Sequence, residues 1–445
     1  MSRSFHVLTF GCQMNVCDSS WISASLRSRG WEETVEEEAD VVVLNTCSVR
    51  DKPEQKVYSV LGRIGPRLQS IPDGFAVVGG CVAQQVGRAI WKRFPFVRLV
   101  FGTDGVHRVP QTMDRLVRGE IGRAALLDFE DAYPERHGGL PDQIPGQAFV
   151  NIMQGCDNFC AYCIVPFTRG RQKSRDIDSV LRECSTLVQR GARELTLLGQ
   201  NVNSFGLDRP SSPSFAELLT AVADIPGLER LRFTTSHPKD IAPEVIEAFG
   251  SLPVLCPQLH LPVQSGSNRI LKAMGRKYTR ERYVDIVRAL RGVRPDLALS
   301  TDIIVGFPGE SEQDFQETMS LLDEVDYAGS FSFMYSDRPG TQAAAMPLKI
   351  DRSEKLDRLT RLQRRQDELT ASHLAGMVGN ETTVLVERPN QKQFGSQIRW
   401  QGRDPGGRIV HFDHVIPDLA GRMVAVKVTG SGGHSLSGET QGAPW

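Results

Sequence analysis

The chain has 445 residues, 40% of them hydrophobic and 24% charged, with a formal net charge of -1. This composition is typical of a soluble globular chain of two or three domains, and it excludes a globally basic nucleic-acid-binding surface. No apolar run reaches the roughly 18 to 20 residues of a membrane span, and the first twelve residues lack a signal-peptide core. Nine cysteines in such a chain indicate reduced thiols. We therefore expect a cytoplasmic protein with no membrane partner.

Residues 1–126 alternate short apolar runs with helix-like stretches. One such stretch spans residues 18–30, with Asp18 as its expected N-cap. Strands that alternate with helices favour a parallel sheet covered on both faces, so we predict a doubly wound α/β domain here. Residues 127–146 are rich in proline, glycine and charge, which predicts a linker. The expected strands are 6–10, 41–45, 75–80 and 97–102.

A longer βα series occupies residues 147–375. Six βα units favour a partial (β/α)6 barrel, and a long doubly wound sheet is the alternative. The series ends in one long predicted helix over residues 351–377. The expected strands are 148–153, 194–199, 230–235, 258–263, 297–306 and 329–335.

Residues 376–440 have a different texture, with β-branched runs separated by glycine, proline and asparagine. This pattern predicts a small all-β, barrel-like domain. Phe394 and Trp400 could stack on nucleic-acid bases or belong to its core. The last residues, Gly438–Trp445, are expected to fray.

Cys156, Cys160 and Cys163 lie in the sequence GCDNFCAYC, a C-x3-C-x2-C spacing directly after an expected strand. Structural zinc is the simplest alternative, but it takes four ligands, usually as two separated pairs, and no fourth candidate lies nearby. Three thiolates suit a [4Fe-4S] cluster that leaves one iron open to a substrate or cofactor.

This spacing resembles the radical S-adenosylmethionine (SAM) superfamily. The resemblance implies that the open iron binds SAM, that Tyr162 packs beside its adenine, and that the fold is a partial barrel with its ligands at the carboxyl ends of the strands. Polar residues follow several of the expected strands and are candidate SAM contacts, although each could equally be a helix cap or a turn residue. They are Gln200, Asn201, Ser236, His237, Gln264, Ser265 and Asp302.

Three further cysteines, Cys12, Cys47 and Cys81, each lie just past an expected parallel strand of residues 1–126. A single cysteine there would favour a buried core position. Because the carboxyl ends of parallel strands gather at one edge of a sheet, three in the same position favour a second [4Fe-4S] cluster with an open iron. We interpret Cys17 as a bystander, and Cys184 and Cys256 as core residues.

Over essentially its whole length the chain resembles the methylthiotransferases. The motifs GCQMN, NTCSVR and GGCVAQ resemble that family's auxiliary-cluster domain, and CDNFCAYCIVPFTRGR resembles its tRNA-modifying MiaB branch. GRIVHFD, MVAVKVTG and HSLSGE resemble the RNA-binding TRAM domain.

The resemblance implies that a SAM-derived radical removes a hydrogen from an isopentenylated adenosine at position 37 of tRNA, next to the anticodon. The auxiliary cluster supplies sulfur and a second SAM supplies a methyl group. The implied partners are a tRNA anticodon stem-loop and a one-electron donor such as flavodoxin or ferredoxin, and the enzyme is expected to be a monomer. The alternatives are a threonylcarbamoyladenosine tRNA or a ribosomal-protein aspartate as substrate, or a non-catalytic iron–sulfur RNA-binding protein.

Contacts with RNA must be local, because the net charge is near zero. Residues 269–294 contain nine Lys or Arg against two acidic residues. A second basic group follows the cysteine loop. Either group could attract phosphates, and the longer one could equally be a solvated helix face. The second group is Arg169, Arg171, Lys173 and Arg175.

Overall fold

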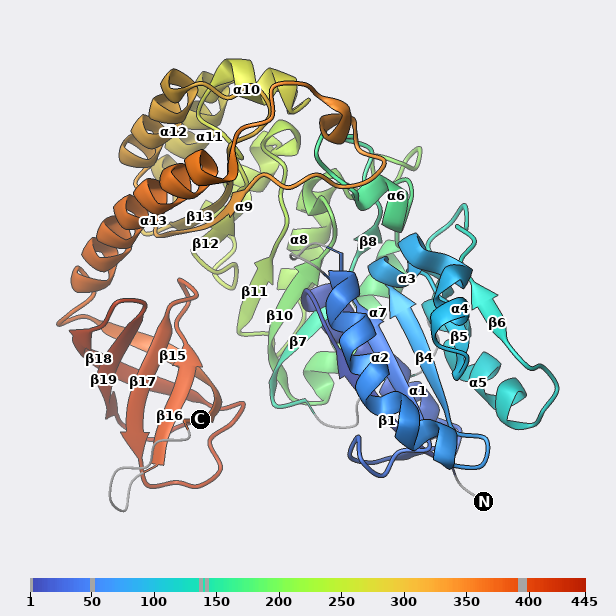
Figure 1. Cartoon of the computed structure of the whole chain (residues 1–445). Helices are drawn as coiled ribbons and strands as arrows, with labels where there is room; N and C mark the ends of the chain where they lie inside the picture. Colours follow the sequence, from blue (N-terminus) through green and yellow to red (C-terminus); the bar gives the residue numbers. More distant parts are fainter. Residues whose placement is uncertain (1–2, 49–52, 136–138, 141–143, 391–397) are drawn as a thin grey trace.

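A computed structural model describes residues 3–48, 53–135, 139–140, 144–390 and 398–445. Figure 1 shows three parts in chain order: a sheet with helices on both faces, a central half-open barrel of parallel strands, and a small closed barrel reached through the long helix α13 (Arg352–Ala375). Phe394 lies outside the described residues. The predicted α/β class with a terminal β-barrel is confirmed.

The N-terminal sheet is parallel, with strand order β2-β1-β3-β4-β5-β6. Alternate residues of its central strands enter different cores: Val43 packs with α1 and α5 on one face, and Val42 with α2 and α3 on the other. The sheet is therefore doubly wound, as predicted. Its elements are β1 (Ser4–Thr9), α1 (Gln13–Ser28), β2 (Glu32–Glu33), β3 (Val41–Thr46), α2 (Pro53–Ser70), β4 (Phe75–Gly80), α3 (Cys81–Val86), α4 (Ile90–Arg93), β5 (Val97–Phe101), α5 (Val109–Val117) and β6 (Ala124–Leu126).

Helix α1 begins six residues earlier than its predicted N-cap implies. Cys12 is its N-cap residue, and Asp18 is buried inside the helix, so the prediction of Asp18 as the N-cap was wrong. Gly11 makes the early start possible, because its φ of 143° allows a turn directly after β1 and its missing side chain leaves room for Asn15 and Cys47.

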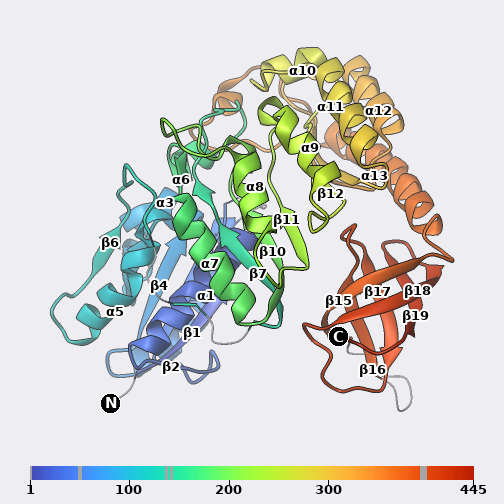
Figure 2. The same cartoon turned by 180° about the vertical axis from the view of Figure 1, so that it is seen from behind.

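The central barrel consists of two three-stranded parallel halves, β7-β10-β11 and β12-β13-β14. Leu231 joins them through backbone hydrogen bonds to Val254 and Cys256. Helices cover the outer face, as Figure 2 shows from behind. The six predicted strands are confirmed. The elements are β7 (Gly146–Asn151), β8 (Met153–Gln154), α6 (Val165–Arg169), β9 (Lys173–Ser174), α7 (Ile177–Gln189), β10 (Ala192–Leu198), α8 (Phe215–Ala223), β11 (Arg230–Phe233), α9 (Pro243–Ser251), β12 (Gln258–His260), α10 (Asn268–Ala273), α11 (Arg280–Val293), β13 (Ala298–Val305), α12 (Glu312–Val325) and β14 (Gly329–Met334).

The C-terminal part is a closed five-stranded barrel of order β15-β16-β17-β19-β18. The prediction that Gly438–Trp445 frays was wrong, because Gly438–Gln441 belong to the strand that closes the barrel and Trp445 exchanges two backbone hydrogen bonds with Met423. Closure removes the free sheet edges that a four-stranded module would leave. The strands are β15 (Glu381–Pro389), β16 (Ile398–Arg403), β17 (Ile409–His414), β18 (Met423–Ser431) and β19 (Ser435–Gln441).

This C-terminal barrel packs against the starts of the central strands. Arg230 donates to the carbonyl oxygens of Arg403 (2.9 Å) and Thr383 (2.5 Å), and Arg232 donates to those of Asp404 and Pro405 (both 2.8 Å). The carboxyl ends of the same strands, where β/α folds carry their sites, therefore lie at the opposite end of the central barrel.

Candidate active site

The loop between β8 and α6 holds Cys156, Cys160 and Cys163 close together. The amide of Cys163 donates to the carbonyl of Cys160 (2.9 Å), and the amide of Cys156 donates to that of Gly170 (3.3 Å). Burial, followed by the nearby charge of Cys160, raises the pKa of the Cys163 thiol to about 12. Metal ligands of this kind must be thiolates, so binding a cluster would release protons here.

Arg276 lies beside this set, and the sequence analysis did not single it out. It is 4% exposed, and its Nη1 lies 3.5 Å from Cys160 Sγ and 3.4 Å from the hydroxyl of Tyr162. Its Nη2 donates to the carbonyl of Pro262 (2.7 Å). It belongs to the basic run 269–294, so composition alone could not separate it from its exposed neighbours.

The carboxyl ends of β10 and β11 form a polar patch with unused hydrogen-bonding capacity. Asn201 Oδ1, Ser236 Oγ and His237 Nε2 are buried and have no partner among the described residues. Asn203, which the sequence analysis missed, also has both amide atoms buried without a partner there. Buried polar atoms are normally hydrogen-bonded, so this patch fits a polar ligand such as SAM.

Gln200 and Asn201 are held by contacts that join the strand ends to the cysteine loop. Gln200 Oε1 accepts from the amide of Gly155 (2.6 Å), and its Nε2 contacts Met14 Sδ of the N-terminal sheet. Asn201 Nδ2 donates to Asp240 Oδ2 (2.6 Å). Asp240 is a third residue, after Arg276 and Asn203, that no sequence motif had indicated.

Gln264 and Asp302 lie on the other half of the barrel. The amide of Gln264 donates to the carbonyl of Asp302 (2.8 Å), and the Gln264 backbone is left-handed, with a φ of 75°. Asp302 Oδ1 lies 3.4 Å from His260 Nε2. The structure brings these two predicted residues together by main-chain contacts.

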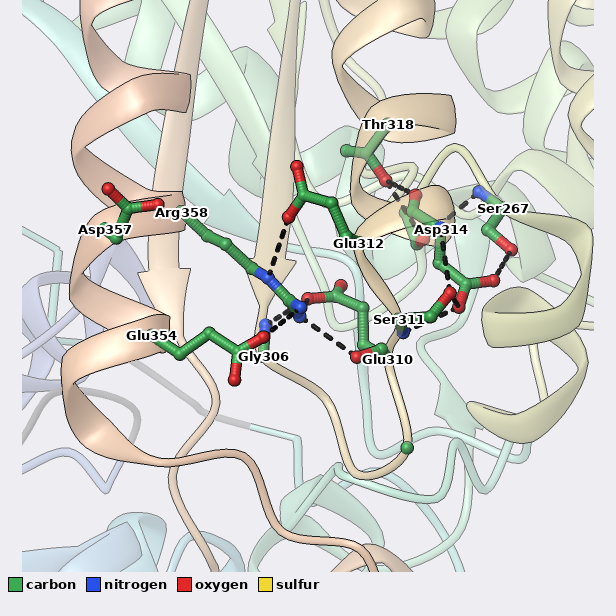
Figure 3. A network of polar contacts seen from close by, with 12 residues as sticks. Ser267, Gly306, Glu310, Ser311, Glu312, Asp314, Thr318, Glu354, Asp357 and Arg358 are labelled. Carbon is green, nitrogen blue, oxygen red and sulfur yellow. Dashed lines mark hydrogen bonds and ion pairs between the residues drawn. The ribbon is translucent and has the colours of Figure 1, made fainter.

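The loop after β13, Gly306–Glu310, is clamped by Arg358 of α13 (Figure 3). Arg358 Nη1 donates to Glu310 Oε2 (2.7 Å), and that oxygen also accepts from the amide of Gly306 (2.6 Å). The side chains of Arg358 and Glu310 are 2% and 1% exposed, and Glu354 contacts the outer edge of the guanidinium. A buried ion pair of this kind fixes a loop only while both partners are present.

Cys12, Cys47 and Cys81 converge at the carboxyl edge of the N-terminal sheet. Cys47 hydrogen-bonds to both of the other sulfurs. The hydrogen bond from Cys47 and the charge of Arg169 lower the pKa of Cys81 to about 5, and the same causes lower that of Cys12 to about 6. The Asn45 side chain braces the site through hydrogen bonds with Asn15.

The elements that adjoin the two cysteine sets contact one another. Helix α6 packs against α3, which begins at Cys81, and the loop that holds Cys156, Cys160 and Cys163 runs directly into α6 (Figure 1). In the part of the chain that the structure describes, no group of Cys, His, Asp and Glu has the arrangement of a single-ion site. A [4Fe-4S] cluster takes its thiolates on different irons and does not require that arrangement.

The basic group 169–175 is not a surface patch, so its interpretation as an RNA contact was wrong. Arg169, Lys173 and Arg175 are each 4% or 5% exposed, and only Arg171 lies at the surface, paired with Asp157. Lys173 contacts Asp104 of the N-terminal part, and Arg175 pairs with Glu183 (2.6 Å). Lys173 therefore joins the central and N-terminal parts internally, and Arg175 fixes the start of α7 within the central part.

The other cysteines and aromatic candidates take structural positions. Cys17 Sγ lies 3.6 Å from the carbonyl of Phe149, and Cys184 and Cys256 are buried in the central barrel. Trp400 is 2% exposed inside the C-terminal barrel, so it belongs to the core and is not available for stacking on a base.

Several cations in the run 269–294 are already paired. Arg269 pairs with Asp314, Arg280 and Arg288 with Glu324, and Arg294 with Asp296. This pairing reduces the positive potential that the run could offer to phosphates, and its role in RNA binding stays a prediction.

Three family models match consecutive parts of the chain. They are the uncharacterized protein family UPF0004 at residues 4–102, the radical SAM superfamily at 150–322, and the TRAM domain at 376–440. A radical SAM methyltransferase structure, TsrM from Kitasatospora setae, has a TM-score of 0.58 at 14% identity and covers 77% of this chain and 74% of its own, which is a likeness of fold.

Two full-length relatives share one name. A tRNA-2-methylthio-N(6)-dimethylallyladenosine synthase from Nitratidesulfovibrio vulgaris is 57% identical over 100% of this chain and 99% of its own, and one from Oleidesulfovibrio alaskensis is 54% identical over 99% of each. This chain belongs to the family of tRNA-2-methylthio-N(6)-dimethylallyladenosine synthases. Membership of this radical SAM family implies a [4Fe-4S] cluster and SAM as cofactors. None of the helices in the described ranges is long and apolar enough to span a membrane.

Proposed function

We propose that this chain converts N6-isopentenyladenosine at position 37 of tRNA, next to the anticodon, into 2-methylthio-N6-isopentenyladenosine. Overall, the C2–H bond of the adenine ring is replaced by a C2–S bond, and the sulfur carries a methyl group from SAM. The full-length likeness to synthases of this name supports that substrate over a threonylcarbamoyladenosine tRNA or a ribosomal-protein aspartate.

In this proposal Cys156, Cys160 and Cys163 hold one [4Fe-4S] cluster, and Cys12, Cys47 and Cys81 hold a second. When bound, the first supplies the electron for reductive cleavage of SAM and the second supplies the sulfur. The chain's own residues bind and orient SAM at the strand ends. The proposed contacts are Tyr162, Gln200, Asn201, Ser236, Gln264 and Asp302.

The observation that carries the proposal is that the elements adjoining the two three-thiol sets, α3 and α6, pack against each other. The loop 155–164 contains the first set and leads into α6, which packs against α3, the helix that begins at Cys81 of the second set. Sulfur insertion at a carbon that has just lost a hydrogen requires that both sites reach the same substrate atom. The contact between α3 and α6 supports such an arrangement.

An anaerobic assay tests the reaction. The reconstituted chain is incubated with SAM, dithionite and tRNA carrying N6-isopentenyladenosine, and the digested nucleosides are identified by mass spectrometry. We expect 2-methylthio-N6-isopentenyladenosine together with 5′-deoxyadenosine. Cleavage of SAM without a methylthiolated nucleoside, in protein with its full iron content, would rule the proposal out.

Single cysteine variants separate the two sites. Cys160→Ala should abolish formation of 5′-deoxyadenosine, because the first cluster loses a ligand. Cys47→Ala should lower the yield of methylthiolated nucleoside at least a hundredfold, while cleavage of SAM persists. Cys184→Ala, at a buried helix position away from both sets, is the matched control and should keep both activities. Equal product from all three variants would contradict the assignment.

We further propose that the enzyme works as a cytoplasmic monomer with flavodoxin or ferredoxin as its electron donor. Because the proposed substrate is a nucleoside of tRNA, we propose that the enzyme works in the cytoplasm. Because reductive cleavage of SAM needs single electrons, we propose a one-electron donor of this class. Light scattering on the reconstituted chain and replacement of dithionite by reduced flavodoxin or ferredoxin test the monomer and the donor.

A further inference from the structure

Arg169 lies where the central barrel meets the N-terminal part of the molecule. It is the last residue of α6 in the central barrel, yet it is buried against the N-terminal sheet, with 4% of its surface exposed. The neighbouring Thr168 carbonyl accepts a hydrogen bond from Thr103 Oγ1 (3.0 Å), which fixes the end of α6 to the N-terminal part. The position of Arg169 is therefore set by both parts.

The guanidinium faces the auxiliary cysteines. It lies close enough to Cys81, Cys12, Cys47 and Asp18 for direct charge interaction, and its helix α6 packs against α3, which begins at Cys81. A guanidinium group stays protonated in proteins, so Arg169 is a buried cation beside these cysteines.

One nitrogen of this buried cation, Nη2, has no hydrogen-bond partner within the described part of the chain. An unpaired buried donor is unfavourable, and more so when it is charged, because it has lost its contacts with water and gained no partner. By contrast, Lys173 and Arg175, which follow in the same basic group, contact carboxylates. The free Nη2 is therefore a donor that fits an anionic group at the three-cysteine site.

We propose that Arg169 is a positioning residue for the auxiliary cluster, in which its buried positive charge retains the anionic cluster and raises the cluster's reduction potential. The inference rests on the proposed function only in that Cys12, Cys47 and Cys81 hold a cluster. Reduction adds one electron from an external donor and forms or breaks no bond. The added negative charge is stabilised by a cation in a medium of low dielectric, and net charge and hydrogen bonds to the sulfurs set such potentials.

The test compares the full chain with Arg169→Met, Arg169→Lys and the matched control Arg171→Met. Arg171 lies two residues further on, at the surface, and pairs only with Asp157 among the salt bridges of the described residues. Iron content and EPR-monitored redox titration with dithionite are measured for each. Added SAM perturbs the signal of the cluster that binds it and so identifies the auxiliary signal.

We expect Arg169→Met to shift the ratio of oxidised to reduced auxiliary cluster at least tenfold, which is a midpoint about 59 mV lower. Arg169→Lys should shift it less, and Arg171→Met not at all. Loss of about half of the iron in Arg169→Met, but not in Arg169→Lys, would also support a role for the charge.

An unchanged midpoint and iron content in Arg169→Met would overturn the inference, and so would equal iron loss in the Met and Lys variants, because shape rather than charge would then matter. If the wild-type chain itself binds only about four irons, the auxiliary cluster of the proposed function fails first. The two failures are therefore distinguishable.

Discussion

His237 lies at the carboxyl end of β11 and is 6% exposed. Nδ1 accepts a hydrogen bond from the amide of Lys239 (3.2 Å), so in the neutral ring the proton is on Nε2, the nitrogen without a partner among the described residues. Burial, with the charges of Arg276, Lys239 and Lys277, lowers the pKa of His237 to about 2. The residue is thus a neutral donor at the polar patch.

This lowered pKa predicts an acid-sensitive stability. Below its ordinary pKa of about 6.5 the unfolded chain binds a proton at His237 and the folded chain does not, so the free energy of unfolding falls as the pH falls from 7 toward 2. Between pH 7 and pH 5 this loss is about 2 kcal/mol. His237→Asn keeps a side chain that can cap the same amide and should remove that part of the pH dependence.

Urea unfolding of both chains at pH 7 and pH 5 measures the effect. His434→Asn, at an exposed position of the C-terminal barrel, is the control and should behave like the wild type. If wild type and His237→Asn lose the same unfolding free energy over this range, the imidazole is not buried in its neutral form.

At the scale of elements, α13 connects the mouth of the central barrel to the C-terminal barrel. Two residues of its first turns contact the mouth. Arg358 pairs with Glu310, and Lys355 donates to the carbonyl of Tyr335 (3.2 Å). Gly306 packs so closely on Lys355 that a Cβ would lie 2.3 Å from its Cγ. The loop Gly306–Glu310 is therefore held by the helix that precedes the C-terminal barrel.

Arg358→Met should leave Glu310 buried and unpaired, and should destabilise the chain by about 3–5 kcal/mol. Because Glu310 also fixes the amide of Gly306 at the mouth, we expect the Kd for SAM to rise about tenfold. Arg361→Met, which removes exposed pairs with Glu312 and Asp357 on the same helix, should cost less than about 1 kcal/mol. Urea unfolding measures the free energy of unfolding, and anaerobic calorimetry measures the Kd for SAM. If Arg358→Met and Arg361→Met have similar values of both, the ion pair of Arg358 with Glu310 does not order the loop.

At the scale of the whole molecule, the C-terminal barrel and the proposed active site lie at opposite ends of the central strands. Arg230 and Arg232 fix that placement, with Glu194 Oε2 2.9 Å from Arg232 Nε. A tRNA bound by the C-terminal barrel therefore has to extend along the side of the central barrel to bring its adenosine to the cysteine loop.

Arg232→Met should loosen the C-terminal barrel and raise the KM for tRNA at least fivefold, while cleavage of SAM without tRNA stays unchanged. Arg193→Met removes a half-exposed pair with Glu229 one strand away and serves as the control. Steady-state kinetics with tRNA measure the KM for tRNA, and formation of 5′-deoxyadenosine without tRNA measures the cleavage of SAM. Both are compared between Arg232→Met and Arg193→Met. An unchanged KM for tRNA in Arg232→Met would mean that the orientation of the C-terminal barrel does not guide binding.

Local pattern was enough to determine the order of strands and helices, the fold class and the two cysteine sets as candidates. Strand ends are encoded by neighbouring residues, and the carboxyl ends of parallel strands must share an edge. For this reason the Asn45-Thr46-Cys47 corner could be predicted as part of a three-cysteine site. The family resemblance added the chemistry that spacing does not contain.

The roles of the charged residues were decided only by the tertiary structure. Arg169 and Arg171 are two residues apart in one basic motif, yet the first is buried beside Cys81 and the second lies at the surface. Arg276 and the tail at Trp445 likewise take positions set by distant partners, Cys160 and Met423. A charge or a strand end pairs with whatever the packing of remote elements brings to it, and no local pattern records that partner.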